Sequence, residues 1–525
     1  MSRRLTVSIL KFVWAAVILW FEYGVFWYAV RQCEWPDSHL TRHSSSDTTH
    51  VLVVADPQIL NHRSYPGRPS ILTYISQVIV DLNIRKSWRQ ATRLKPHAVV
   101  FLGDMMDGGR FPMDDAEYEK YYRRFKHIFS IEPGIPEYFI PGNHDIGLRM
   151  TRNASKKAHE RYISHFGPLN QLVALGGYKL VMIDAPGLVE EDYIRERKGY
   201  SFQEWKSIPG GAVEFVKAIA EGVRDDPVIL FSHIPLSRPD AADCGPLRER
   251  GTIHPGIGDG YQNTLGDQAT DFLLQSLTPS LILSGDDHDY CEYYHNSTSA
   301  RSASTRVREV TVKSLSMAMN VKFPGFQLLS LTSDQRQENG KSLGHADELC
   351  LLPDQLSIYL FKYIPLLLVS LLILFVVNTA PAYLPQPFRS PQAVHTGYQG
   401  HMTRLGHRAL PGRDSGRDPM SDSYYHNDLT LPPPLSAAKC KPRPRTTWTF
   451  HLLGRRRRIS FPWPLALVSK AVRDRLLFHN LTVKGRSKHV LKRSGVIGGF
   501  INDTRAVASI PLSIIVLISC WILYY

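Results

Sequence analysis

Three stretches of the chain are apolar over a length that would cross a lipid bilayer. We predict membrane-spanning helices at residues 1–31, 357–379 and 505–525. The first stretch is too long for a cleaved signal peptide, and no small-residue cleavage site follows it before Arg31, so we interpret it as an uncleaved anchor. Its acidic residue, Glu22, lies among tryptophan and tyrosine, which is typical of a carboxylate at the membrane interface.

Between the first two spans, short runs of β-branched and other apolar residues recur, and each ends in polar residues. The runs are His50–Ala55, Ala98–Leu102, Tyr138–Ile140, Lys179–Ile183, Val228–Phe231 and Leu281–Leu283. Helical patterns separate them at residues 114–130, 155–165, 211–221 and 270–277. Two further strand-like stretches, 308–315 and 327–331, would complete a second sheet. This alternation predicts a layered α/β domain over residues 50–335, in which ligands gather at the ends of the strands.

The remaining segments differ in composition from this domain. We predict linkers at residues 32–49 and 336–356, and a basic segment, disordered over 380–447, at residues 380–504. That basic segment holds 21 Lys and Arg against 6 Asp and Glu, which accounts for the net charge of +14 of the whole chain. Because the charge is not on the folded domain, no nucleic-acid partner is predicted. The run Arg455–Arg458 either binds anionic lipid headgroups or is a solvated flank.

The distribution of charge also predicts the topology. Positive segments stay on the cytoplasmic side of a membrane, so residues 380–504 are expected there and the 50–335 domain in the lumen of the secretory pathway. Four of the six cysteines lie in the whole luminal region between the first two spans, residues 31–357, where disulfides form, as do sequons at Asn153 and Asn296.

Five groups of metal-capable residues follow the apolar runs. They are Asp56-Pro-Gln58, Gly103-Asp104-Met-Met-Asp107, Gly142-Asn143-His144-Asp145, Ser232-His233 and Gly285-Asp286-Asp-His288. Each group alone is weak evidence for a metal site, because Asp, Asn and His also form turns and helix caps. Together, at one edge of a sheet, they predict a site for two divalent ions that share a carboxylate and assist displacement at phosphorus.

The order of these groups resembles the signature of calcineurin-like metallophosphoesterases, namely D-x-H, GD-x-x-D, GNH(D/E), H and GHxH. The resemblance implies a four-layer αββα sandwich and a phosphoric ester hydrolase. It implies that Asp104 is the bridging carboxylate, with Asp56 and His288 on the first metal ion and Asn143 and His233 on the second.

The same resemblance implies two catalytic residues. His144 would stabilise the phosphoryl transition state and protonate the leaving group, while Asp145 orients its ring. Asp107 is expected to support the site rather than to bind metal. Both Asp104 and His144 are present, which favours a catalytically active enzyme over a member of the family that has lost catalysis.

The chain departs from the family signature at two positions. Gln58 replaces a histidine in the first group, and Asp286 replaces one in the last. Both replacements keep an oxygen that can bind metal, so Gln58 and Asp286 are predicted as ligands. The harder donor set favours Mn²⁺ over Zn²⁺ or Cu²⁺.

A narrower resemblance concerns the substrate. The sequence around Ala55-Asp-Pro-Gln, Tyr65-Pro-Gly-Arg-Pro69 and Ser284-Gly-Asp-Asp-His-Asp-Tyr-Cys291 resembles a fungal endoplasmic reticulum membrane branch of the family. This branch, related to the animal post-GPI-attachment phosphoesterase, uses Mn²⁺ to remove ethanolamine phosphate from a mannose of GPI glycans. The expected partners are then GPI-anchored substrates and the membrane. The alternatives are another luminal phosphoester, or a non-catalytic cargo or scaffold module.

One loop is expected to reach over this site. Cys244–Asn263 follows His233 and contains Arg248, Arg250 and several glycines, so it either contacts substrate or is an ordinary surface loop. Cys244 and Cys291 flank the metal-capable groups, and we hypothesise a disulfide between them that braces this loop.

Overall fold

The computed structural model of the chain describes most of the predicted domain and all three spans. The described residues are 2–40, 48–150, 152–222, 227–299, 302–332, 344–379, 445–452, 455–462 and 496–524. The chain divides into two compact units, one of Met1–Pro381 with Ser494–Tyr525 and the other of Ala382–Arg493. In the second unit, β14 (Arg445–Leu452) and β15 (Arg455–Pro462) form an antiparallel hairpin that contains the Arg455–Arg458 run. Residues 380–444, most of the stretch predicted to be disordered, lie outside the described residues.

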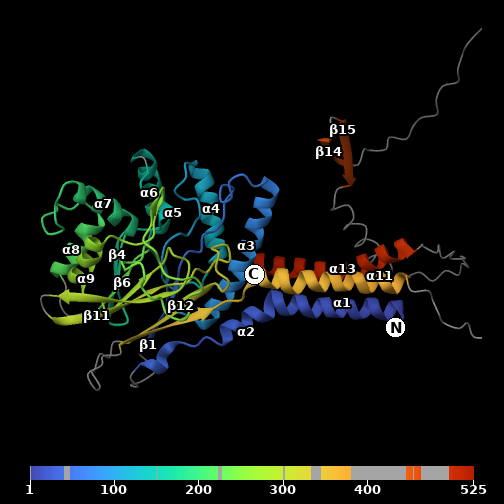
Figure 1. Ribbon diagram of the computed structural model, residues 1–525, viewed down its shortest axis with the longest axis horizontal. Helices are drawn as coiled ribbons and strands as arrows, with labels where there is room; N and C mark the ends of the chain where they lie inside the picture. Colours follow the sequence, from blue (N-terminus) through green and yellow to red (C-terminus); the bar gives the residue numbers. More distant parts are fainter. Residues whose placement is uncertain are drawn as a thin grey trace, which may run out of the picture. The chain divides into compact units, whose positions relative to one another are not determined.

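Two sheets form the centre of the first unit (Figure 1). One has the order β13 (His345–Leu351), β12 (Gly325–Thr332), β1 (Thr48–Val54), β2 (Ala98–Phe101) and β3 (Glu137–Phe139). The other has the order β10 (Cys291–Ser299), β11 (Ser302–Thr311), β9 (Leu281–Ser284), β6 (Val228–Phe231), β5 (Tyr178–Met182) and β4 (Gln171–Leu175). Strands β1, β2 and β3 run parallel, as do β5, β6, β9 and β11. Antiparallel strands β12 and β13 continue the first sheet beyond β1, and β4 and β10 form the two edges of the second.

The side chains of β1 show why its sequence is continuously apolar. Val51 and Val53 pack in the core between the two sheets, while Leu52 and Val54 point into a second core outside the first sheet. Both faces of the strand are therefore buried, as is typical of parallel strands in layered folds.

Helices cover the outer face of each sheet. The first sheet is covered by α3 (Ser70–Ala91), α4 (Asp115–Ile128) and α6 (Arg152–Phe166), whose buried side chains belong to its outer core. The second sheet is covered by α7 (Ala185–Arg197), α8 (Ala212–Gly222) and α9 (Asp267–Leu277). The predicted four-layer αββα sandwich is confirmed.

Several details of the prediction are wrong. Part of the expected linker 336–356 is the edge strand β13, which pairs with β12. The stretches near 308–315 and 327–331 do not belong to one sheet, because β11 lies in the second sheet and β12 in the first. Helices α3 and α7 and strands β4 and β10 were not predicted.

Three helices of the described chain are long and apolar enough to cross a membrane, spanning Arg3–His39, Gln355–Thr379 and Val496–Leu523. The first comprises α1 (Arg3–Leu19), the π-helical turn η1 (Trp20–Gly24) and α2 (Val25–Arg31), and it packs beside α11 (Ile364–Thr379) and α13 (Val496–Tyr524) (Figure 1). Helix α13 begins at Val496, earlier than the predicted boundary at residue 505.

Polar contacts fasten this bundle to the α/β domain. Glu22 of η1 accepts hydrogen bonds from Lys86 of α3 at 2.7 Å and from Tyr363, in the π-helical turn η4 (Tyr359–Tyr363), at 2.7 Å. Glu22, predicted as a carboxylate at the membrane interface, is thus the ionic partner of a buried lysine where the first span meets the domain. A disulfide between Cys33 and Cys350 joins the end of the first span to β13.

Candidate metal centre

The predicted site residues follow the carboxyl ends of parallel strands. Asp56 comes after β1 and Asp104 after β2, His233 comes after β6, and Asp286 and His288 come after β9. Five backbones here are left-handed, with φ between 34° and 69°, at Asp56, Gln58, Asp104, Asp286 and His288. Such conformations are costly for residues other than glycine and cluster at functional sites. They turn the chain sharply, so that each side chain points back across the edge of the sheets.

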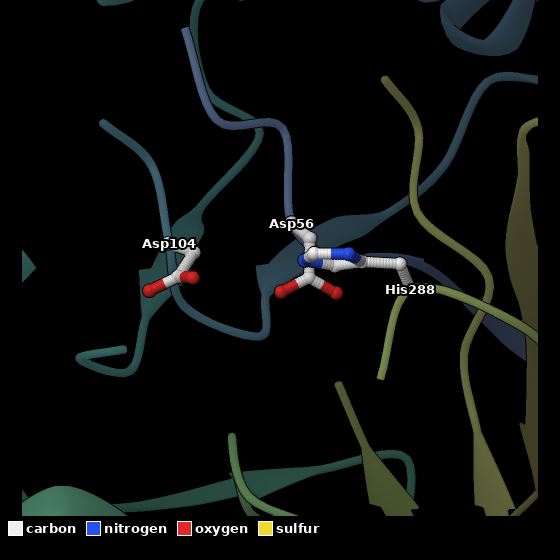
Figure 2. Close-up of side chains that lie close together, drawn as sticks. All are labelled: Asp56, Asp104 and His288. Atoms are coloured by element: carbon white, nitrogen blue, oxygen red, sulfur yellow. The ribbon is translucent and has the colours of Figure 1, made fainter. Parts of the chain in front are cut away.

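These side chains form two groups that share Asp104. In the first group, ligand atoms of Asp56, Asp104 and His288 all lie within 4.8 Å of one another, and in the second the same holds for Asp104, His233 and Asp286. Figure 2 shows the first group, with the two carboxylates and the imidazole approaching from separate loops. One carboxylate between two donor groups is the arrangement that two neighbouring cations require.

Hydrogen bonds orient the donors of the second group. Nδ1 of His233 lies 2.6 Å from the carbonyl oxygen of Leu102, which can only accept, so Nδ1 carries a hydrogen and Nε2 faces the site. The amide nitrogen of Asn143 donates to the carbonyl of Gly260 at 2.8 Å. The amide oxygen of Asn143 is therefore directed inward and lies 3.2 Å from Nε2 of His233. Asn143 thus joins this group, as predicted from its sequence position.

The electrostatics of the site fit bound cations. Oδ2 of Asp56 is buried and has no hydrogen-bond donor among the described residues. Burial raises the pKa of Asp56 well above its ordinary value, with a further rise from the charges of Asp104 and Asp286. Burial lowers the pKa of His233, but the charges of Asp104 and Asp286 reverse this effect and raise it. The pocket therefore attracts positive charge, which either protons or divalent ions can supply.

Asp107 orients His144. Nδ1 of His144 lies 2.7 Å from the main-chain oxygen of Asp107 and 3.1 Å from its carboxylate. Because the carbonyl can only accept, Nδ1 carries a hydrogen and Nε2 is left to react. Burial lowers the pKa of His144, but the charge of Asp104 and the bond to Asp107 raise it to about 9.

Asp145 does not contact that ring, so its predicted orienting role is wrong. Its oxygens accept backbone N–H groups of Met105 at 3.3 Å, Met106 at 3.2 Å and Gly142 at 3.0 Å. A buried carboxylate beside three backbone donors is held by them. Asp145 thereby ties the loop after β2 to the turn that begins α5 (Asn143–Ile146).

The orientation of the Gln58 side chain also differs from the predicted role of an oxygen ligand. Its amide nitrogen, rather than its oxygen, faces the site, donating to Oδ2 of Asp104 at 2.6 Å and lying 3.4 Å from Nε2 of His288. The buried carboxylate of Asp104 draws the donor end of the amide. Gln58 therefore holds the shared carboxylate in place and offers no oxygen ligand in this arrangement.

Two glycines are required by close packing around the ligands. A Cβ on Gly142 would lie 2.1 Å from Oδ1 of Asp104, and one on Gly103, whose φ is +94°, would lie 2.4 Å from Nδ1 of His233. Only glycine allows these approaches. This explains the glycines that precede Asp104 and Asn143 in the sequence.

The loop Cys244–Asn263 reaches the site, and its disulfide is confirmed. Cys244 and Cys291 are bonded, with Cα atoms 4.3 Å apart. Besides binding Asn143, the carbonyl of Gly260 accepts a hydrogen bond from Arg110 at 3.0 Å. Arg248 is paired with Asp287 at 2.6 Å, beside the ligand groups.

A buried ionic network behind the site was missed by sequence reasoning. Glu309 of β11 lies 2.7 Å from Arg238 and 2.6 Å from His295, and it is fully buried. The available signal was the period of two along the strand, because Glu309 lies on the same face as Val307 and Thr311, which are both buried.

Comparisons with known proteins agree with this geometry. A family model described as calcineurin-like phosphoesterase matches residues 49–290. Cell division control protein 1 of Saccharomyces cerevisiae is 33% identical over 358 residues, which cover 66% of this chain and 70% of that protein. Metallophosphoesterase 1 of Ailuropoda melanoleuca is 27% identical over 60% of this chain and 78% of its own length. The Drosophila melanogaster homolog of Metallophosphoesterase 1 is 24% identical over 60% of this chain and 81% of its own length. The chain therefore belongs to the calcineurin-like phosphoesterase family and is a hydrolase of phosphoric esters.

Proposed function

We propose that the chain is a two-metal phosphodiesterase that removes ethanolamine phosphate from a mannose of membrane-embedded GPI glycans. The observation that carries this proposal is the placement of Asp104, shared by two donor groups, in a domain fastened by a disulfide and an ion pair to membrane-spanning helices. A catalytic domain held at the bilayer meets lipid-anchored substrates at high effective concentration. The narrower resemblance in sequence supports the choice of glycan.

In this proposal the two donor groups hold two divalent ions. Asp56 and His288 would hold one ion, Asn143, His233 and Asp286 would hold the other, and Asp104 would be shared by both. Bound ions supply a nucleophile at neutral pH and offset the charge on the phosphoryl oxygens. Oxygen donors outnumber the two imidazoles, which favours Mn²⁺.

His144 is the proposed general acid. Asp107 fixes the ring through Nδ1, which leaves Nε2 as the atom that can hold and release a proton. Nε2 can then donate a proton to the mannose oxygen as the bond from that oxygen to phosphorus breaks. Gln58 keeps the carboxylate of Asp104 oriented during this step.

We further propose that the domain lies in the lumen of the endoplasmic reticulum. Its two disulfides, Cys33–Cys350 and Cys244–Cys291, suit an oxidising compartment. The basic segment of residues 380–504 suits the cytoplasmic face. A protease-protection experiment on sealed microsomes tests this, with epitopes placed after residue 40 and after residue 420. Protection of the second epitope rather than the first would reverse the topology.

Lipid analysis tests the substrate. Cells lacking the protein should accumulate GPI intermediates that retain ethanolamine phosphate, and wild-type protein should remove it. An Asp104→Asn variant should be inserted normally but leave the intermediates unchanged, whereas Asp240→Asn, outside both donor groups, should rescue fully. Unaltered GPI intermediates in the deficient cells would favour another luminal phosphoester. Full rescue by Asp104→Asn would instead favour a non-catalytic role.

A further inference from the structure

A cavity of about 360 Å³ lies between the α/β domain and the start of the second span. One wall contains Glu249 and Arg250, and a second contains the loop Met317–Lys322. The third wall is the beginning of the second span, Asp354–Phe361. None of these residues belongs to the two donor groups of the metal centre.

The cavity has a surplus of available positive charge. Glu249 is already paired with Lys313 at 2.7 Å and accepts backbone N–H groups of Lys322 and Phe323. Asp354 caps the helix that begins the span, accepting from Ser357 N–H at 2.8 Å. The exposed side chains of Arg250 and Lys322, in contrast, have no hydrogen-bond or ionic partner among the described residues. An anionic ligand would therefore complement this surface.

The other side of the cavity is apolar and lies at the level where the chain enters the bilayer. Leu356 is 56% exposed, Phe361 is 69% exposed, and Phe323 beside the cavity is 45% exposed. Leu356 and Phe361 belong to the span Gln355–Thr379 itself. A ligand with a charged head and apolar chains would satisfy both sides at once.

Two walls of the cavity are bonded directly to the loop that carries Asp286 and His288. Backbone N–H groups of Glu249 and Arg250 donate to Asp289 at 2.8 and 3.0 Å. The N–H of Ser314, three residues before the second wall begins at Met317, donates to the carbonyl of His288 at 2.9 Å. The cavity is thus connected by backbone hydrogen bonds to a loop of the metal centre, and it lies on the membrane side of that centre.

We propose that this cavity binds the phosphodiester headgroup of an anionic phospholipid, the phosphatidylinositol part of the lipid-anchored substrate. Arg250 and Lys322 contact the phosphate, and the acyl chains pass along Leu356 and Phe361 into the bilayer. Binding there places the glycan of the same molecule toward the metal centre. The assignment of this lipid to the substrate rests on the proposed function, whereas the binding of the headgroup does not.

Binding is measured with the full-length protein in nanodiscs containing a trace of fluorescent phosphatidylinositol, with a chelator present so that no hydrolysis occurs. The variant Arg250→Gln/Lys322→Gln should bind about 25-fold more weakly, since each basic residue at an anionic surface contributes about fivefold. The control Arg197→Gln/Lys206→Gln removes two exposed charges outside the cavity and should bind as the wild type does. Equal binding by all three proteins, or equal loss in both variants, would overturn the headgroup site.

Two activity measurements separate this proposal from the proposed function. Hydrolysis of a soluble aryl phosphodiester should be the same in the wild type and both variants, because the metal centre is untouched. With GPI glycolipid in nanodiscs, the Arg250→Gln/Lys322→Gln variant should show a raised KM and an unchanged kcat. Weaker lipid binding with an unchanged KM would refute the substrate assignment alone. A wild type that hydrolyses no GPI glycolipid would refute the proposed function, while the binding result still decides the headgroup site.

Discussion

Replacing Glu309 with glutamine tests whether a buried charge holds the metal centre together. Oε1 of Glu309 accepts hydrogen bonds from the backbone of Leu236 at 3.1 Å and from the hydroxyl of Ser284 at 2.7 Å. Leu236 follows the proposed ligand His233 by three residues, and Ser284 precedes the proposed ligand Asp286 by two. Glu309 therefore fastens two ligand loops from behind, although it touches neither metal position.

The size of the expected destabilisation follows from the charges around the carboxyl group of Glu309. Burial raises the pKa of Glu309, but Arg238 and His295 lower it further, to about 2 from an ordinary value of 4.5. At 1.36 kcal/mol for each pKa unit, this difference corresponds to about 3 kcal/mol of stability at neutral pH. Because the pKa is lower in the folded state, the contribution is complete above about pH 4.5 and is lost as the pH falls toward 2.

Thermal unfolding of the full-length protein in detergent measures this effect. Glu309→Gln should destabilise the domain by about 3 kcal/mol at pH 7, a fall of roughly 6 °C in Tm, and the difference should shrink below about pH 4.5. The affinity of the Glu309→Gln variant for metal ions should also fall, because the loops that carry His233 and Asp286 are held less firmly. Glu292→Gln is the matched control, since Glu292 pairs with Arg308 at the partly exposed surface of the same hairpin. A Glu309→Gln protein as stable as the control, or equally destabilised at all pH values, would refute this reasoning.

Three further predictions concern the acid, the anchor and the metals. His144→Ala should lower kcat by about 10²- to 10⁴-fold with unchanged metal content by elemental analysis, and a loss of bound metal would instead make His144 structural. Lys86→Met should destabilise the full-length protein in nanodiscs by about 3–5 kcal/mol because it leaves the carboxylate of Glu22 buried without a countercharge, while Glu22→Gln/Lys86→Met should recover much of that loss. A double variant no more stable than Lys86→Met would contradict the ion pair. Chelation should lower the Tm, and adding Mn²⁺ back should restore it with release of protons, measured by calorimetry in two buffers, because ions replace protons at His233 and Asp56. Metal binding without proton release would contradict the assigned electrostatics.

The sandwich and most of its ligands could be predicted because they follow from local patterns. A continuously apolar strand reveals that both of its faces are buried, and the polar residues after it mark the edge where parallel strands converge. Asp56, Asp104, Asn143, His233, Asp286 and His288 all come together as this logic expects.

The elements that were missed depend on distant partners. Helix α3 contains Arg85 and Lys86 at buried positions, so its polar and apolar residues do not separate into two faces. Lys86 is buried against partners that are distant in the sequence, Glu22 of the first span and Gln355 at the start of the second. Strand β13 is polar because it lies at a sheet edge, and therefore its sequence is typical of a linker.

Roles of individual side chains were harder to predict than their positions. Asp145 directly follows His144 and Asp107 lies 37 residues before it, but Asp107 is the one that reaches the ring. Gln58 lies among the ligands as expected, yet its donor end is drawn to Asp104. These contacts depend on the three-dimensional path of the backbone around each residue, which residue type alone does not reveal.

The most direct test of the central proposal is hydrolysis of a purified GPI glycolipid that carries ethanolamine phosphate on mannose. The full-length protein in nanodiscs with Mn²⁺ should release ethanolamine phosphate, measured by mass spectrometry. Release should cease with a chelator and fall by at least about 10³-fold in Asp104→Asn. The absence of release from a preparation that still hydrolyses a soluble phosphodiester in the presence of Mn²⁺ would contradict the proposed substrate.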